Sequence, residues 1–133
     1  MTNSRAARLV LLAAIAAQVG CSQSPIVENS RRVPSPGGEQ LVTVETVDNG
    51  LGFGLGRLYE EVHVTSDSRQ IIGHGETDSS VVFYVDVTES QGEAVGVRWL
   101  DGKSIEISYD RSQAPGRMAT SEAGVSITYR VRQ

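Results

Sequence analysis

The sequence predicts an all-β fold: a small antiparallel β-sandwich or partly open barrel of about six or seven strands. From residue 39 onward, apolar and polar side chains alternate along several stretches, as in strands with one buried face and one wet face. After the first twenty residues, no stretch carries the period of an amphipathic helix. Because buried parallel strands read as continuous apolar runs, the clean alternation favours antiparallel pairing. At 133 residues, the chain has room for one such domain.

The predicted strands follow one another at short intervals. In chain order they cover residues 40–47, 58–65, 81–88, 95–99, 105–110 and 125–132. The last four alternate most clearly, and the second places Val62 and Val64 toward the core.

For the connection between 95–99 and 105–110, the sequence indicates how the two strands pair. A two-residue loop at Asp101-Gly102 would place Val97 opposite the charged Glu106. A three-residue loop, 100–102, instead pairs Val97 with Ile105 and keeps apolar residues opposite each other. We therefore predict the three-residue loop, with Gly102 left-handed in a bulge.

The first twenty residues predict a secretory signal peptide. Arg5 and Arg8 precede the short apolar run 9–17, which ends in small residues. A transmembrane helix needs about 20 apolar residues, so this run is too short to serve as one. We expect residues 1–20 to form the leader, 21–36 a flexible Ser- and Pro-rich tether, and 37–133 the β domain.

Cys21 is the chain's one cysteine, and it follows the leader directly. With Val19 and Gly20 before it, it resembles the lipobox of bacterial lipoproteins, from which Gln18 departs because an aliphatic residue is usual there. The resemblance implies lipid on Cys21, including palmitate, and anchoring in the cell envelope. Since Ser22 is not Asp, it also implies the periplasmic face of the outer membrane in a Gram-negative cell.

Ordinary secretory cleavage is the alternative to lipidation. Cutting after Ala16 would leave Cys21 as a free thiol in a soluble secreted domain. An unpaired thiol is a liability in an oxidising compartment, which favours acylation. More than one acyl chain gives stable anchoring.

The charge of the exported part excludes some partners. The chain has 12 basic and 16 acidic residues; without Arg5 and Arg8, 10 basic and 16 acidic residues remain, a net charge of −6. A dispersed acidic surface is a poor match for nucleic acid or anionic lipid. We expect membrane contact through the lipid, and an envelope protein or cell-wall component as the partner.

Two motifs carry a second resemblance. Residues 35–39 (SPGGE), followed by a strand, are similar to the turn that opens strands in β-propeller blades, although the chain lacks the repeats and the length of a propeller. Together with 97–105 (VRWLDGKSI), they resemble an uncharacterised family of small bacterial envelope proteins. The family implies an all-β domain and no assigned activity.

The glycine-rich segment 48–56 is the most unusual stretch. Glycines at every second position separate Leu51, Phe53 and Leu55, and the segment matches no nucleotide-binding pattern. These three side chains are the candidate partner-binding loop. The alternative is a plain connection whose apolar side chains fold back over the core.

Other chemistry has weaker support. His63 and His74 are conceivable metal ligands with Glu61, Glu76 or Asp78, but their spacing fits no metal motif, so we expect ordinary surface histidines, no metal and no cofactor. No G-x-S-x-G elbow supports a serine hydrolase. Trp99 lies on an inward position and is expected in the core rather than on a binding platform.

These observations favour a non-enzymatic binding or structural module of the envelope. A small periplasmic or cell-wall enzyme, or an inhibitor of one, is the alternative. A pocket converging on His63 or His74 with buried carboxylates would favour the enzyme.

Overall fold

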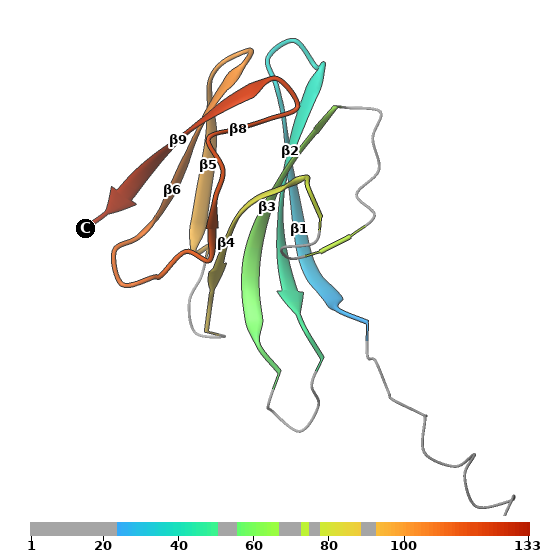
Figure 1. Ribbon diagram of the computed structural model, residues 1–133, viewed down its shortest axis with the longest axis vertical. Coiled ribbons are helices and arrows are strands. Elements are labelled where there is room, and N and C mark those ends of the chain that lie inside the picture. Colours follow the sequence, from blue (N-terminus) through green and yellow to red (C-terminus); the bar gives the residue numbers. More distant parts are fainter. Residues whose placement is uncertain (1–23, 51–55, 67–72, 75–77, 89–92) are drawn as a thin grey trace, which may run out of the picture.

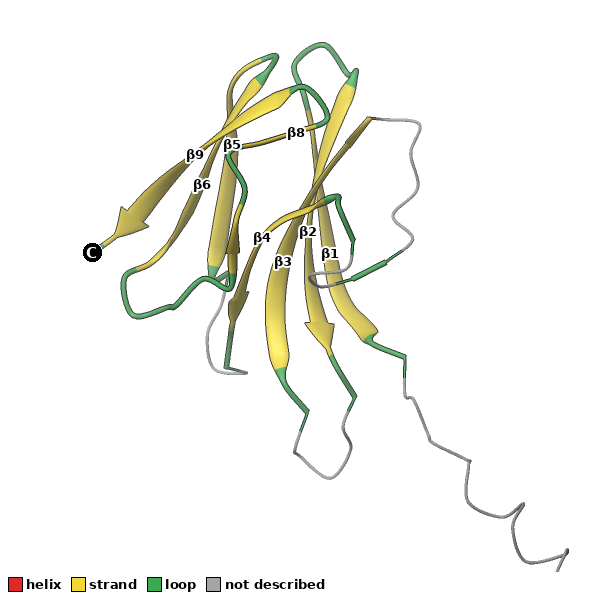
Figure 2. Cartoon of the chain, in the orientation of Figure 1, coloured by secondary structure: helices red, strands yellow, loops and turns green. Residues whose placement is uncertain are grey.

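The protein is a two-sheet β-sandwich (Figures 1 and 2). The computed structural model describes residues 24–50, 56–66, 73–74, 78–88 and 93–133, and within these ranges every regular element is a strand. The strands are β1 (Ile26–Pro34), β2 (Gln40–Asp48), β3 (Leu58–Ser66), β4 (Val81–Asp86), β5 (Val95–Asp101), β6 (Ser104–Asp110), β7 (Arg117–Met118), β8 (Ser121–Glu122) and β9 (Val125–Arg132). The prediction of an all-β fold is confirmed, and of the two predicted architectures, sandwich and partly open barrel, the chain adopts the sandwich.

The strands divide into two sheets whose inner faces meet. The first sheet has the order β1-β2-β3-β4-β7, and the second has the order β5-β6-β9-β8. Apolar residues from both sheets pack into one core because the inward positions of most strands share one parity. In β4, Val82 joins Phe83 and Val85 in the core at an irregularity in the β3–β4 pairing. The core comprises Val42, Val44, Val62, Val64, Val82, Phe83, Val85, Val95, Ile105, Ile107, Tyr109, Val125 and Ile127.

Trp99 packs against this core, as predicted. Its indole Nε1 donates a hydrogen bond to the carbonyl oxygen of Val33 at 3.0 Å. Because Val33 lies in β1 and Trp99 in β5, this bond joins the edges of the two sheets.

The predicted tether is wrong for most of its length, since β1 forms within it. Residues Ile26–Pro34 pair antiparallel with β2, and a turn at Ser35 reverses the chain between them. Three hydrogen bonds hold this turn: Gly38 N donates to Ser35 O, Ser35 N to Gln40 O, and Gln40 N to Ser35 Oγ. β1 shows little alternation because most of its side chains are exposed and need not be apolar.

The β5–β6 hairpin also differs from the prediction. The turn residues are Gly102 and Lys103, and Val97 pairs with Ile107 rather than Ile105. A bulge at Leu100 lets Trp99 pair with Ile105, which restores apolar pairing across the hairpin. Apolar residues of the two strands therefore face each other as predicted, but the predicted three-residue loop is wrong, and Gly102 does not have a positive φ.

Among the described strands, one pair departs from antiparallel order. β9 runs parallel to β6 because the chain first crosses to the first sheet as β7 and then returns through β8. β9 keeps a clean alternation, with Val125 and Ile127 inward and Ser126 and Thr128 exposed, since its outer face is wet. Alternation therefore reports which face is buried rather than strand direction.

Candidate functional site

The outer face of the first sheet buries a group of polar side chains. Val62 and Val64 of β3 face the core, so Glu61 and His63 lie on the opposite face. Both are fully buried there, with 0% of their surface exposed. Segments that follow β3 contact this face, because His74 reaches Glu61 and Ser80 reaches His63.

β2 supplies the second carboxylate of this group. Glu45 is directly opposite Glu61 in the β2–β3 register, and it is 8% exposed. Thr43 and Thr65 lie on the same face and are also buried. The alternation of apolar and polar residues predicts that this outer face of β2 and β3 is exposed to solvent, but the structure buries it.

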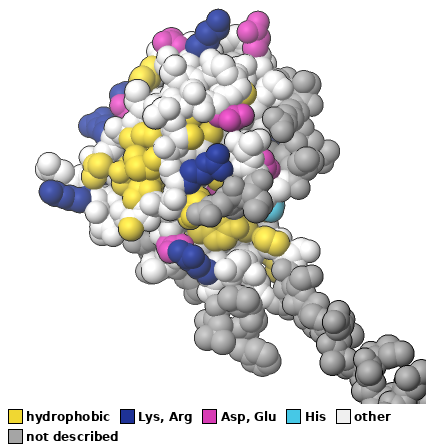
Figure 3. Space-filling model, viewed as in Figure 1, with side chains coloured by type: hydrophobic (Ala, Val, Ile, Leu, Met, Phe, Trp, Pro, Cys, Tyr) yellow, Lys and Arg dark blue, Asp and Glu magenta, His cyan; other side chains and the backbone are white. Residues whose placement is uncertain are grey.

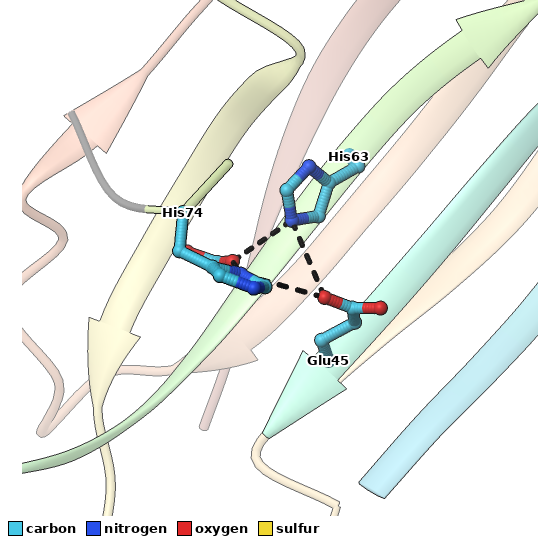
Figure 4. A group of neighbouring side chains, drawn as sticks. Glu45, His63 and His74 are labelled. Atoms are coloured by element: carbon cyan, nitrogen blue, oxygen red, sulfur yellow. Dashed lines mark hydrogen bonds and ion pairs between the residues drawn. The ribbon is translucent and has the colours of Figure 1, made fainter. Parts of the chain in front are cut away.

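Four side chains converge at one point of this face, and Figure 4 shows three of them, Glu45, His63 and His74, pointing toward one another. The Nε2 atom of His63 lies 2.9 Å from Glu61 Oε1 and 3.7 Å from Glu45 Oε2. The Nδ1 atom of His74 lies 2.5 Å from Glu61 Oε1 and 3.6 Å from Glu45 Oε2. One donor atom from each residue lies within 4.8 Å of the other three. We call Glu45, Glu61, His63 and His74 the His–Glu cluster.

A second layer of hydrogen bonds orients the His–Glu cluster. The second nitrogen of His63, Nδ1, lies 2.9 Å from Ser80 Oγ. Asp78 accepts a hydrogen bond from Ser80 N at 2.8 Å. Burial alone raises the pKa of Asp78, but hydrogen bonds from the amide and hydroxyl of Ser80 outweigh it and lower this pKa. Ser80 thus links His63 to a charged carboxylate.

One carboxylate oxygen of Glu45 accepts a hydrogen bond, and the other has no hydrogen-bond partner. Its Oε1 accepts a hydrogen bond from Ser30 Oγ at 3.3 Å. Its Oε2 is buried and has no hydrogen-bond partner, since the two imidazole nitrogens are 3.6 and 3.7 Å away. A buried carboxylate oxygen without a hydrogen bond is costly, so Oε2 is the atom of the cluster with unused binding capacity.

The opposite face of β3 carries a buried carboxylate with a different role. Glu60 accepts hydrogen bonds from Val95 N at 2.8 Å and Ala94 N at 3.4 Å, at the start of β5. Burial raises its pKa, and these two amides partly offset that effect. Glu60 joins the two sheets and takes no part in the His–Glu cluster.

The sequence-based expectations for the two histidines are corrected by this arrangement. The prediction of dispersed surface residues is wrong: His63 is fully buried, and the two rings are 6.0 Å apart. Of the ligands considered with them, Glu61 belongs to the cluster and Asp78 supports it through Ser80. Glu76 lies outside the described residues.

Glu45 was missed, although its sequence position carries part of the signal. It has the parity opposite to Val42 and Val44, so it had to lie on the outer face of β2. Its pairing with Glu61 needs the β2–β3 register, which the long connection between these strands does not fix.

The remaining predicted site residues are not part of the described structure. Cys21 and the loop residues Leu51, Phe53 and Leu55 fall outside the described ranges. No helix within those ranges is long and apolar enough to cross a membrane.

Hydrophobic side chains gather on the face shown in Figure 3, and a histidine is visible at its right-hand edge. The side chain of His74 is 23% exposed, whereas that of His63 is fully buried. An open pocket elsewhere is lined by Tyr109, Arg111, Gln113, Val131 and Gln133, none of which belongs to the cluster.

The chain matches no protein-family model, and comparisons with curated proteins and with solved structures give no match. Function is therefore inferred from the sequence, the fold and the His–Glu cluster.

Proposed function

We propose that this chain is an exported lipoprotein, held in the bacterial cell envelope by lipid on Cys21, with a sandwich that acts as a non-enzymatic binding or structural module. The observation that carries the proposal is the position of Cys21 directly after a basic, apolar leader. The partner is an envelope protein or a cell-wall component, and in a Gram-negative cell the domain lies at the periplasmic face of the outer membrane.

The start of the sandwich supports anchoring close to the membrane. β1 begins at Ile26, so five chain steps separate Cys21 from the first strand, about 17 Å at full extension. Ile26 and Val27 are 59% and 40% exposed, respectively. Apolar side chains at the end of the domain nearest the lipid are suited to contact with the bilayer interface.

Burial of the His–Glu cluster supports a module rather than an enzyme. Glu61 and His63 are fully buried, and their donor atoms already contact one another. A substrate would have to displace these contacts to reach either residue. Among the four members of the cluster, the side chain of His74 is 23% exposed and that of Glu45 is 11% exposed, whereas Glu61 and His63 are fully buried.

Mass spectrometry of the mature N-terminus tests the proposed address. The full chain is expressed in a Gram-negative host and purified from its membrane fraction. We expect a chain that begins at an acylated Cys21, and a Cys21→Ser variant that is neither acylated nor retained in the membrane. A Gln18→Leu variant keeps the cysteine and restores the usual lipobox residue, so it should be acylated at least as completely. A mature chain beginning after Ala16 with a free thiol, or an intact unacylated leader, would overturn the proposal.

A further inference from the structure

We propose that Glu45, Glu61, His63 and His74 form a binding site for one divalent transition-metal ion, with Zn²⁺ as the best match. This goes beyond the lipoprotein proposal and does not depend on it, because the site is built entirely within the sandwich. The donor atoms are the Nε2 of His63, the Nδ1 of His74 and one carboxylate oxygen from each glutamate.

The spacing between Glu45 and the two histidines fits ligands that share one small ion, whereas Glu61 Oε1 lies 2.9 and 2.5 Å from the two nitrogens and has to move away from them when an ion binds. Zinc bonds to imidazole nitrogen and carboxylate oxygen are about 2.0–2.2 Å long, which places tetrahedral ligands about 3.3 Å apart. Glu45 Oε2 lies 3.7 and 3.6 Å from the nitrogens of His63 and His74. These separations are too long for hydrogen bonds and close to the ligand spacing on a shared ion.

The charge of the site calls for a cation or for protons. Two glutamates at directly opposed positions bring two negative charges into a buried region. A divalent ion bound with neutral imidazoles neutralises both charges at once. The 2.9 Å contact between His63 Nε2 and Glu61 Oε1 needs a shared proton, so a metal ion that binds both atoms releases it.

The donor types select the class of metal. Calcium and magnesium prefer six or more oxygen ligands, whereas imidazole favours zinc, copper, nickel and other transition ions. Two nitrogens and two oxygens from four residues also form a closed set with no position left for substrate. The site is therefore suited to a structural metal that joins β2, β3 and the segment carrying His74.

The surrounding hydrogen bonds are those that a metal site requires. A histidine ligand normally donates from its second ring nitrogen, which fixes the tautomer that presents a lone pair to the ion. His63 Nδ1 has Ser80 Oγ as its acceptor at 2.9 Å, and Asp78 holds Ser80 in turn. Ser30 plays the same part for Glu45, since it binds Oε1 and leaves Oε2 free for the ion.

Zinc titration of the full chain tests the site. The chain, purified in detergent, is first stripped with a chelator and then titrated with Zn²⁺ against a chromophoric competitor. We expect one ion per chain, a tetrahedral spectrum with Co²⁺, and much weaker binding of Mg²⁺ and Ca²⁺. Glu45→Gln and His74→Gln should each weaken Zn²⁺ binding by at least about tenfold, because each removes a ligand. These two residues are the least buried of the four, so the variants are expected to fold.

Glu60→Gln is the matched control. Glu60 is a buried carboxylate on the same strand as Glu61, but it faces the core and binds amides of the second sheet. Its substitution should leave zinc affinity unchanged. Absence of saturable binding by the folded wild-type chain would overturn the proposal. Equal affinity of wild type and Glu45→Gln, or a loss of affinity in Glu60→Gln as large as that in Glu45→Gln, would do so too. None of these results bears on acylation of Cys21, which the N-terminal mass measures separately.

Discussion

Glu45 and Glu61 face each other across the β2–β3 pair, and the same two imidazoles contact both carboxylates. Like charges at directly opposed positions of an antiparallel pair destabilise a sheet. The burial of both carboxylates at opposed positions has a physical explanation if a cation or a proton lies between them. The contacts of His63 and His74 show where that charge would be.

Zinc should therefore stabilise the wild-type chain but not the Glu45→Gln variant. A ligand present at 100 times its Kd stabilises the folded state by about 2.7 kcal/mol, which corresponds to a rise in Tm on the order of 10 °C for a domain of this size. In chelator, Glu45→Gln should be as stable as wild type or more stable by up to about 1 kcal/mol, because it removes one of two opposed charges. Circular dichroism melts with zinc and with chelator measure both effects. An equal zinc-induced shift in both proteins would contradict this prediction.

Tyr129 should make stability fall at alkaline pH. Its hydroxyl donates a hydrogen bond to Ala119 O at 2.6 Å, and burial raises its pKa to about 12. An unfolded tyrosine ionises near pH 10, so between these values the unfolded chain has released a proton that the folded chain retains. Rising pH therefore favours unfolding, and the stability present below pH 10 is lost as pH approaches 12.

The Tyr129→Phe variant separates this effect from the rest of the titration. Because the variant lacks the hydrogen bond to Ala119 O, its free energy of unfolding at neutral pH should be lower by about 1 kcal/mol, and its stability should fall less steeply above pH 10. Urea unfolding between pH 8 and about pH 11.5 measures the slope. Ser126→Ala, at an exposed position of the same strand, should keep the wild-type slope. Parallel slopes for wild type and Tyr129→Phe would count against the assignment.

The Trp99 indole should contribute to stability by joining the sheets. Trp99→Phe keeps an aromatic ring against the core but removes the donor to Val33 O, and we expect a cost of about 1–3 kcal/mol from the lost hydrogen bond and reduced packing. Unfolding in urea is followed by circular dichroism, because Trp99 is the chain's one tryptophan and its substitution removes the tryptophan fluorescence signal. Leu100→Ala, at a neighbour 49% exposed, should stay within about 0.5 kcal/mol of wild type. A Trp99→Phe variant as stable as wild type would show that the bond between the sheet edges contributes little.

Local alternation predicted the strands with one wet face but missed β1. The six expected strands correspond to β2–β6 and β9, because each has a consistent apolar side that the core buries. The residues of β1 read as a tether in the sequence because an exposed edge strand needs no periodic apolar side chains. The position of the β5–β6 turn was also predicted wrongly. A bulge at Leu100 brings the apolar residues of the two strands opposite each other, and no residue pattern in the sequence indicates this bulge.

The candidate site was predictable only in part, and two of its residues show why. His63 and Glu61 are two positions apart on one strand, so the sequence alone places them on the same face. Glu45 joins them through a register that a long connection leaves open, and His74 joins them through a segment that returns over the sheet. Both steps depend on contacts between residues far apart in the chain.

The sequence by itself determined that this chain is all-β and which side of each alternating strand faces the core, because side-chain direction in a strand follows a period of two. The two-sheet arrangement, rather than a partly open barrel, came from the tertiary structure. Tertiary structure decided whether the other side meets water. It covered the polar face of β2 and β3 and brought Glu45, Glu61, His63 and His74 within reach of one ion. A strand's own pattern cannot report what packs over its polar face, since that depends on where the rest of the chain returns.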